Sequence, residues 1–227
     1  MTMAAKRCLD VVGAVVGLVL LSPVFAIVAI AIKLDTAGPV FFRQQRVGRD
    51  GRLFAIFKFR SMSVDAPRRG SALTVRADVR ITRTGRFLRK SKLDELPQLV
   101  NVLVGDMSLV GPRPEVPQFM RFYSPEQRAI IVSMRPGMTD YAAILFRDES
   151  TLLDQTEDPI EVYRRLIMPV KFGHYERYSR EIGILTDLRI ILATVLSLTT
   201  GRVPSWLGIK RELLAAPVLP GRSRCSG

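Results

Sequence analysis

The chain has 227 residues, and its 34 lysines and arginines against 21 aspartates and glutamates give a formal net charge of +13 at pH 7. This charge favours an anionic partner, which is nucleic acid, an anionic lipid surface or a phosphorylated substrate. The two cysteines, Cys8 and Cys225, lie at opposite ends of the chain, and His174 is the one histidine. This composition excludes a disulfide framework and argues against a structural zinc site of the Cys/His type.

Residues 11–32 form an apolar segment of 22 residues without a charge. A helix that crosses a bilayer needs about 20 such residues. Ser22 and Pro23 interrupt the segment, because proline lacks an N–H and disfavours the helical conformation of the preceding residue. Positive charge favours the cytoplasmic side of a membrane segment, and here it lies on both flanks, at Lys6, Arg7, Lys33, Arg43, Arg46 and Arg49.

A re-entrant helical hairpin that bends at Ser22-Pro23 and returns to the same side satisfies both flanks. A kinked transmembrane span and a buried helix of a soluble core are the alternatives. The apolar run is longer than the roughly 7–15 apolar residues of a signal peptide, and no Ala-x-Ala-like cleavage site follows it. We therefore expect residues 1–35 to remain attached as a membrane anchor.

A β-hairpin is predicted next. Residues 40–46 and 53–62 are rich in strand-forming residues, and Asp50-Gly51 between them is a strong turn dipeptide. Alternation along the second strand places Lys58 and Arg60 on the same face. Together they form either a paired anion site or an ordinary solvated strand face.

An amphipathic helix follows, ended by Gly105. Its apolar residues at helical spacing are Leu96, Leu99, Val100, Leu103 and Val104. Two starts are compatible with the sequence: a capping box that opens at Ser91, or Asp94 as the cap with Pro97 where N–H groups need no partner. Both starts place Asp94 and Glu95 in the first turn, where free N–H groups and the macrodipole favour anions.

Three roles are open to Asp94 and Glu95. An ionised aspartate beside cations can bind a divalent cation such as Mg²⁺, or it can attack phosphorus and form an acyl phosphate. Neighbouring helical residues project about 100° apart, so the two carboxylates are expected to play different roles. The third reading is that both residues only cap the helix.

Further basic residues surround this pair in the sequence. Pro112 and Pro114 lock the backbone around Arg113, whose planar guanidinium then suits phosphate oxygens; the alternative is a rigid turn with a surface arginine. The upstream cations form either a solvated face or a patch for anionic lipid head groups. These upstream cations are Arg83, Arg86, Arg89, Lys90 and Lys92.

The C-terminal part begins with an apolar stretch at residues 182–198 that carries Asp187 and Arg189. This pattern predicts a helix buried on one face, either in the core or at the membrane interface. Residues 203–227 contain Pro217 and Pro220 and are predicted to form a loosely ordered tail.

Several of these motifs occur in an order that resembles the bacterial sugar transferases, the monotopic phosphoglycosyl transferases. The motifs are the early helix with Ser-Pro, KFRSM, LRKSKLDELPQLVNVLVGDMSLVGPRPE and RPGMTD. The resemblance extends from about Lys6 to Thr200. It implies an α/β fold that is mainly α with a small β-hairpin. The re-entrant anchor then holds a catalytic domain, residues 36–202, on the cytoplasmic face of the bacterial inner membrane through interfacial helices.

The resemblance also implies a reaction. Such enzymes transfer a sugar-1-phosphate from a UDP-sugar to polyprenyl phosphate, usually undecaprenyl phosphate, and release UMP. They require Mg²⁺, and the reaction is the first membrane step of a surface glycan such as exopolysaccharide, capsule or O-antigen.

The family match assigns roles to individual residues. Asp94 is expected to be the nucleophile that forms a phosphosugar–enzyme intermediate, and Glu95 is expected to support the dyad and the metal. The cations expected to neutralise the substrate phosphates are Lys58, Arg60, Arg89 and Arg113.

Two other functions are weighed against this one. A non-catalytic membrane-surface protein would not need the intact Asp94-Glu95 pair with its cations. A nucleic-acid-binding protein would be expected to carry a recognisable binding module, and the chain has an anchor instead. We therefore expect a UDP-sugar, a polyprenyl phosphate lipid and the membrane as partners, and no nucleic acid. The sequence leaves open which sugar is carried and whether the chain forms a homodimer.

Overall fold

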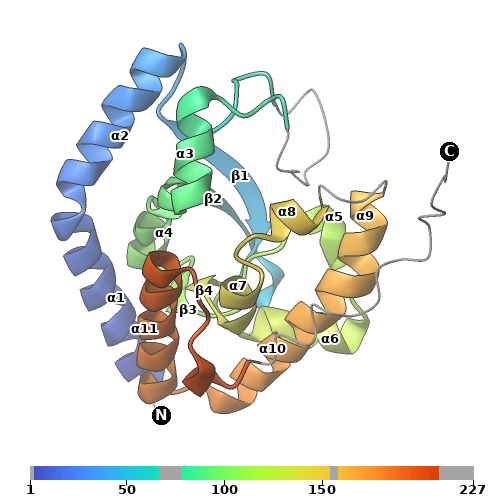
Figure 1. Ribbon diagram of the computed structural model, residues 1–227. Coiled ribbons are helices and arrows are strands. Elements are labelled where there is room, and N and C mark those ends of the chain that lie inside the picture. Colours follow the sequence, from blue (N-terminus) through green and yellow to red (C-terminus); the bar gives the residue numbers. More distant parts are fainter. Residues whose placement is uncertain (1–2, 67–77, 154–157, 210–227) are drawn as a thin grey trace, which may run out of the picture.

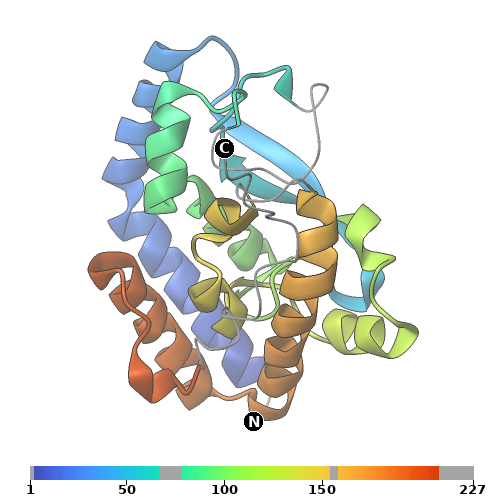
Figure 2. The ribbon, with the colours of Figure 1, turned by 45° about the vertical axis from the view of Figure 1, so that its right-hand side comes forward.

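The computed structural model describes residues 3–66, 78–153 and 158–209 of the chain. Helices surround two small two-stranded sheets (Figures 1 and 2). The helices are α1 Met3–Leu20, α2 Ser22–Asp35, α3 Arg83–Ser91, α4 Gln98–Val104, α5 Pro117–Met120, α6 Pro125–Ser133, α7 Tyr141–Leu145, α8 Glu149–Leu153, α9 Pro159–Val162, α10 Met168–Glu181 and α11 Ile184–Thr200. The strands are β1 Phe41–Val47, β2 Leu53–Phe59, β3 Ser108–Val110 and β4 Gly137–Thr139. Short helical turns lie at Arg49–Gly51, Leu93–Glu95, Tyr163–Ile167 and Ser205–Leu207. The prediction of a mainly helical fold with a small β-hairpin is confirmed.

The apolar N-terminal segment is a bent pair of helices. Leu21 separates α1 from α2, and the two axes are bent by 60°. The Ser22 hydroxyl donates to the Val19 carbonyl at 2.8 Å, and Pro23 lies in the first turn of α2, where a missing N–H removes no helical hydrogen bond. The predicted break at Ser22-Pro23 is therefore confirmed. Within the described ranges no single helix has the length and apolarity to cross a membrane, whereas α1 and α2 together meet both requirements.

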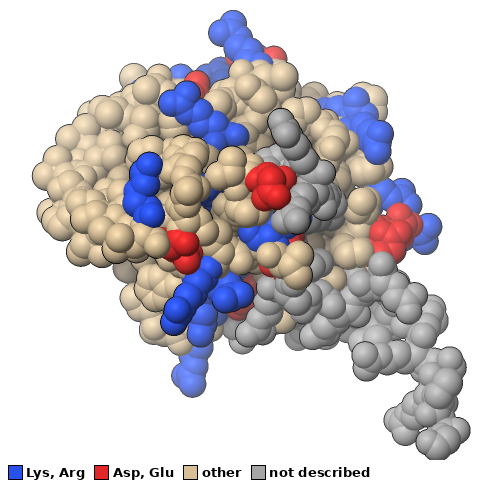
Figure 3. Space-filling model, turned by 90° about the horizontal axis from the view of Figure 1, so that it is seen from above, with Lys and Arg blue, Asp and Glu red and all other residues tan. Residues whose placement is uncertain are grey.

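The outer face of this helix pair is apolar and exposed, and Leu34 at its end is 83% exposed. The other large exposed apolar residues of the pair include Val12, Val16, Val19, Leu20, Ile27 and Ile30. Figure 3 shows few charged side chains over the broad surface at the left, the side where α1 and α2 lie in Figure 1. A face of this kind is not that of a buried core helix, so this reading of the segment is wrong.

Helix α11 packs beside α1 (Figures 1 and 2). It buries Asp187, Ile190 and Ala193 on its inner side. Its outer side adds Leu185, Leu188, Leu192, Val195 and Leu198 to the exposed apolar residues. The predicted one-sided burial of this stretch is confirmed.

Both ends of the bent pair are held by the rest of the fold. Near the start of α1, Lys6 Nζ lies 2.5 Å from Asp187 Oδ2 and 3.1 Å from the Val110 carbonyl. At the end of α2, Arg60 donates to the Thr36 carbonyl at 2.6 Å and to the Ala37 carbonyl at 2.8 Å. The same folded unit therefore holds the start of α1 and the end of α2.

Strands β1 and β2 form the predicted antiparallel hairpin, with Phe41 opposite Phe59 and Val47 opposite Leu53. Asp50 and Gly51 have φ values of 57° and 75°, the left-handed conformations that the tight turn requires. Phe59 is buried against the aromatic ring of Phe25, whose centroid lies 5.1 Å away. Lys58 lies on the opposite face of β2, and its side chain is also largely buried.

Strands β3 and β4 form a short parallel pair in which Ser108 lies opposite Gly137 and Val110 opposite Thr139. Two glycines allow the backbones to approach closely, because a Cβ at Gly137 would lie 2.1 Å from the Gly111 amide nitrogen. This pairing brings the Pro-Arg-Pro turn after β3 against the segment that leads into α7.

Both predicted starts of the helix after Asp94 are wrong. The Ser91 hydroxyl donates to the Phe87 and Leu88 carbonyls, so it ends α3 and caps nothing downstream. Asp94 and Glu95 lie in the short turn Leu93–Glu95, and α4 begins only after Pro97, without a side-chain cap. The predicted end at Gly105 is confirmed, with a φ of 102°.

Residues 36–202 and 203–227 remain a predicted division into a domain and a tail. The described start of the tail is packed, because Leu207 is buried against α11 and its neighbours. Residues 210–227 lie outside the described residues.

Candidate active site

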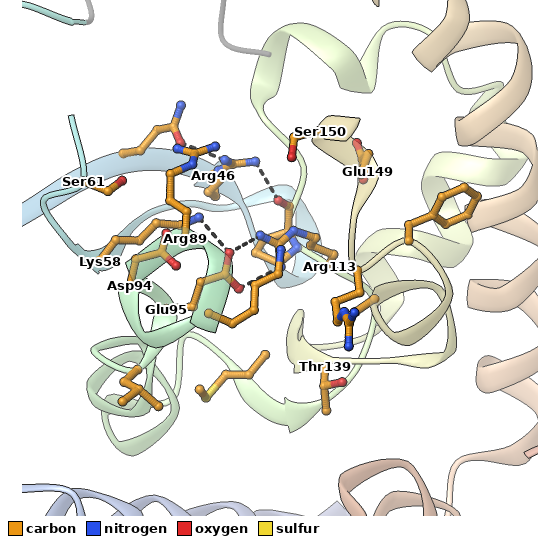
Figure 4. Close-up of a pocket in the computed structure, with 18 of the residues that line it drawn as sticks. Arg46, Lys58, Ser61, Arg89, Asp94, Glu95, Arg113, Thr139, Glu149 and Ser150 are labelled. Carbon is orange, nitrogen blue, oxygen red and sulfur yellow. Dashed lines mark hydrogen bonds and ion pairs between the residues drawn. The ribbon is translucent and has the colours of Figure 1, made fainter. Parts of the chain in front are cut away.

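Side chains from distant parts of the sequence line one cavity of about 1030 Å³. Figure 4 shows Lys58 from β2, Asp94 and Glu95 from the turn before α4, and Arg113 from the turn after β3 on one side of this cavity. The structure therefore brings together four of the residues predicted from the sequence.

Glu95 is bound by two cations. Arg113 binds both carboxylate oxygens, through Nη2 to Oε1 and through Nη1 to Oε2 at 3.0 Å. Lys58 Nζ also donates to Oε1 at 3.0 Å. Although burial alone would raise it, the charges of Arg113 and Lys58 hold the pKa of Glu95 well below its usual range. Glu95 is thus a permanent anion that positions two cations.

Asp94 differs from Glu95 in its contacts. Its side chain is buried, yet it forms no hydrogen bond or ion pair with any residue that the structure describes. Burial, followed by the charge of Glu95, raises the pKa of the Asp94 carboxyl, and Lys58, Arg89 and Lys92 oppose this rise. A buried carboxylate that is near cations and bound to none of them is available to react.

The cations around the two carboxylates are themselves partly desolvated. Burial lowers the pKa of Lys58, and the charge of Glu95 opposes this effect. Burial likewise lowers the pKa of Lys92, which ends α3 in a left-handed conformation with a φ of 59°. Arg89 on α3 lines the same cavity. Such a cluster is suited to the oxygens of a diphosphate.

The backbone around Arg113 is fixed from two sides. The Pro112 carbonyl accepts a hydrogen bond from the Gly137 amide at 2.9 Å, and the Arg113 amide donates to Asp140 Oδ2 at 3.0 Å. Asp140 is buried, and its other oxygen accepts from the Ala143 amide at 2.6 Å, which caps α7. Arg113 therefore reaches Glu95 from a rigid support, as the flanking prolines predicted.

Arg46 and Arg60 differ from the sequence expectation. Arg46, predicted only as a flanking charge, lines the cavity and donates to the Pro114 carbonyl at 3.0 Å, next to Arg113. Arg60 also lines the cavity, but its terminal nitrogens bind the backbone at the end of α2. The shared strand face predicted for Lys58 and Arg60 thus serves two purposes, since Lys58 contacts Glu95 and Arg60 holds the anchor.

A comparison with known protein families identifies the family of this chain. The family described as bacterial sugar transferase matches residues 1–201 of the chain. The chain belongs to the bacterial sugar transferase family. The resemblance read from the sequence motifs is confirmed.

Individual bacterial sugar transferases are similar to this chain over most of its length. UDP-N-acetylgalactosamine-undecaprenyl-phosphate N-acetylgalactosaminephosphotransferase of Aeromonas hydrophila is 37% identical over 203 residues, which are 86% of this chain and 44% of that protein. UDP-glucose:undecaprenyl-phosphate glucose-1-phosphate transferase of Caulobacter vibrioides is 40% identical over 86% of this chain and 70% of that protein. Exopolysaccharide production protein PSS of Rhizobium leguminosarum bv. phaseoli is 36% identical over 89% of this chain and 99% of that protein. The chain thus spans less than half of the Aeromonas protein.

The donor set of this sugar transferase fits a magnesium ion only together with a substrate. Among the described residues there is no group of three or more His, Cys, Asp or Glu side chains that could hold a metal. Magnesium usually takes one or two protein carboxylates and completes its octahedron with phosphate oxygens and water. Asp94 and Glu95 would be those carboxylates, and within the described part of the chain Asp94 is the one of the two without another partner.

Some residues of this sugar transferase site were not predicted from the sequence. Arg46, Asp140 and Glu149 line or support the cavity from positions remote from the dyad in the chain. The one local signal was Asp140 at the end of the RPGMTD motif, where an aspartate before a helix predicts a cap. The others become neighbours of the dyad only through the tertiary fold.

Proposed function

We propose that this sugar transferase moves a sugar-1-phosphate from a UDP-sugar to polyprenyl phosphate, with undecaprenyl phosphate as the natural lipid, and releases UMP. The observation that carries the proposal is the carboxylate of Asp94, which has no partner among the described residues and lies beside the Glu95 that Arg113 and Lys58 hold. The Aeromonas and Caulobacter relatives, which are named as undecaprenyl-phosphate sugar phosphotransferases, support the choice of acceptor and reaction.

In the first step, a carboxylate oxygen of Asp94 attacks the phosphorus that bears the sugar. A bond forms between this oxygen and phosphorus, and the bond from phosphorus to the bridging oxygen breaks, so that UMP leaves with the electron pair. Phosphoryl transfer depends mainly on positioning and charge neutralisation. Lys58, Arg89 and Arg113 supply the positive charge on the dyad side of the cavity.

In the second step, a phosphate oxygen of the polyprenyl phosphate attacks the same phosphorus. The acyl-phosphate bond breaks, Asp94 regains its carboxylate, and the product is a polyprenyl diphosphate sugar. The covalent intermediate allows the soluble donor and the lipid acceptor to react in turn at one aspartate.

Magnesium is proposed as the cofactor. Asp94 and Glu95 would hold the ion, which would supply neutralisation of the charge on the departing nucleotide. Glu95 keeps its negative charge through its contacts with Arg113 and Lys58, whose effect on its pKa outweighs burial. This permanent charge suits a role in support of the metal and the dyad.

The cavity also offers a route for a lipid. Beyond the charged side it is lined by apolar residues of α11 and α1, and several of them are exposed on the outer surface. The exposed lining residues on α11 are Leu188, Val195 and Leu198. A polyprenyl chain that lies along this apolar face can present its phosphate to the cations inside the cavity.

We further propose that α1 and α2 form a re-entrant anchor, with the catalytic domain on the cytoplasmic face of the inner membrane. Lys6 binds Asp187 at the start of the pair, and Arg60 binds the Thr36 and Ala37 carbonyls at its end. Because one folded unit holds both ends, both ends belong on the same side of the bilayer. The exposed apolar outer face then lies in the lipid, and the cytoplasmic side is the one where nucleotide sugars occur.

The biological role proposed for the reaction is the first membrane step of a bacterial surface glycan. The relative described as an exopolysaccharide production protein supports this role. The acceptor chemistry agrees, since a sugar linked to a lipid diphosphate is a substrate for transferases that add further sugars.

The reaction is tested with detergent-solubilised protein, a panel of UDP-sugars, undecaprenyl phosphate and Mg²⁺, with release of UMP as the readout. We expect UMP from the unmodified protein and none from Asp94→Asn. Asp50→Asn is the matched control, because Asp50 is exposed in the hairpin turn and asparagine tolerates its φ of 57°. Near-normal turnover of Asp94→Asn would overturn the assignment of the nucleophile.

A further inference from the structure

The side of the cavity opposite the dyad has a different chemical character. Figure 4 shows Glu149 and Ser150 of α8 facing the dyad, with Arg113 between the two sides. Lys171 of α10 is buried there, and its Nζ lies 2.6 Å from Glu149 Oε2. This pair cancels its own charge, so the α8–α10 side lacks the strong positive charge of the dyad side.

Lys171 is held in place by more than Glu149. Its Nζ lies 3.5 Å from the Tyr163 hydroxyl and 4.8 Å from the centre of the Tyr163 ring. The ammonium group is thereby enclosed by a carboxylate and an aromatic side chain. Lys171 is therefore not a free cation for phosphate binding.

Tyr175 supplies a buried polar group on this side of the cavity. It lies on α10 one turn after Lys171, lines the cavity and is fully buried. Its hydroxyl has no hydrogen-bond partner among the residues that the structure describes. An unpaired hydroxyl inside a folded protein is costly, so such a group calls for a ligand atom or an ordered water.

The position of Arg113 indicates which part of the donor reaches the α8–α10 side of the cavity. Figure 4 places Glu149 and Ser150 across Arg113 from Asp94 and Glu95, and Glu149 and Tyr175 line the same cavity as Arg113. In the proposed reaction the sugar is bonded directly to the phosphorus that Asp94 attacks, whereas the nucleoside is one phosphate further away. Of the two, the sugar is therefore the part that we expect to lie nearer to the reacting centre and to reach Glu149 and Tyr175 across Arg113.

We propose that Tyr175 and Glu149 form a subsite for the sugar ring of the donor, with the Tyr175 hydroxyl bonded to a sugar hydroxyl or to an amide substituent of the ring. The inference rests on the proposed function. A hydroxyl and a carboxylate neutralised by a lysine suit a neutral, hydroxyl-rich ring, whereas a phosphate would gain no net positive charge from this pair. A site built to hydrogen-bond a substrate hydroxyl discriminates strongly against an analogue that lacks it. Tyr175 is thus a residue that selects the sugar.

The test compares Tyr175→Phe with the unmodified protein in three measurements. These are the KM for the UDP-sugar, the inhibition constant of UMP, and the turnover of a panel of donors that each lack one sugar hydroxyl or amide substituent. Tyr141→Phe is the matched control, because the Tyr141 hydroxyl donates to Glu181 at 2.7 Å and does not line the cavity.

Loss of one neutral hydrogen bond should raise the KM of Tyr175→Phe about tenfold. The inhibition constant of UMP and the values for Tyr141→Phe should stay unchanged. One donor of the panel should be turned over poorly by the unmodified protein. Tyr175→Phe should turn over the same donor as well as it turns over the parent sugar. The melting temperature should stay the same or rise, because the variant removes a hydroxyl that has no partner in the protein.

An equal rise in the KM and the UMP inhibition constant would place Tyr175 at the nucleoside and overturn the inference. So would unchanged kinetics, or a fall in the melting temperature, which would reveal a structural partner. These results are distinct from failure of the proposed function. In that case the unmodified protein itself releases no UMP from any UDP-sugar, and the inference falls with it.

Discussion

Arg113 binds both carboxylate oxygens of Glu95, and this pairing leaves the neighbouring Asp94 without a partner among the described residues. Two adjacent acidic residues thus have opposite roles. The anionic Glu95 holds Arg113 and Lys58 in position, while Asp94 lies within range of the same cations and is free to react. The chemistry proposed for this sugar transferase depends on that difference.

Lys58→Met should move the acid limb of the pH profile to higher pH. Burial and the charge of Glu95 raise the pKa of Asp94, and Lys58 is the largest opposing influence. Without Lys58 the pKa of Asp94 rises further, and because the nucleophile must be ionised, activity is lost at a higher pH as the solution is acidified. The measurement is kcat/KM against pH. Lys90→Met, at an exposed position on α3, is the control, and an unshifted limb in Lys58→Met would contradict this electrostatic reading.

Asp140→Ala should lower both stability and activity. The substitution leaves the amides of Arg113 and Ala143 without their acceptor, and each unpaired buried N–H costs about 1–3 kcal/mol. Asp140→Asn keeps one acceptor oxygen and should lose about half as much. Thermal unfolding in detergent and UMP release measure the two effects. If Asp140→Ala is as stable and active as the unmodified protein, Asp140 does not support Arg113.

Lys6→Met should destabilise the packing of α1 on the rest of the fold by about 3–5 kcal/mol, because Asp187 would remain buried without its cation. Lys6→Met combined with Asp187→Leu removes both charges and should recover most of the loss. Tyr178 would keep the Val110 carbonyl as an acceptor at 3.1 Å in the double variant. Melting temperatures of the three proteins test this, and equal stability of Lys6→Met and the unmodified protein would show that the pair does not hold α1.

The re-entrant topology should be visible by labelling from each side of the membrane. Single cysteines replace Ala5, before the apolar part of α1, and Asp50, in the hairpin turn after α2, in a protein without Cys8 and Cys225. A membrane-impermeant maleimide should reach both positions from the cytoplasmic side only. Labelling of the two positions from opposite sides would establish a transmembrane span in place of the re-entrant anchor.

The sequence predicted the features that local chemistry decides. The break at Ser22-Pro23 follows from the missing N–H of proline, and the hairpin follows from Asp50-Gly51 between two strand-forming runs. Periodicity alone located α4 and its end at Gly105 but not its start. Lys92 ends α3 in a left-handed backbone conformation. A separate short turn that carries Asp94 and Glu95 then lies between α3 and α4.

The division of roles within the site was beyond the reach of sequence spacing. Neighbouring positions show that Asp94 and Glu95 differ in direction, yet only the tertiary fold decides which of them meets Arg113. Alternation likewise placed Lys58 and Arg60 on one strand face, but β2 ends at Phe59, and Arg60 reaches the end of α2 instead of the dyad. The apolar helices and turns were predictable because their causes are local, and the partners across the cavity were not.

The most direct test of the whole account is mass spectrometry of the intact protein, quenched after incubation with the UDP-sugar and Mg²⁺ but without lipid acceptor. The expected result is a phosphosugar adduct that peptide mapping places on Asp94 and that disappears when polyprenyl phosphate is added. Release of UMP with no adduct on the protein, in repeated quenches, would contradict the covalent mechanism.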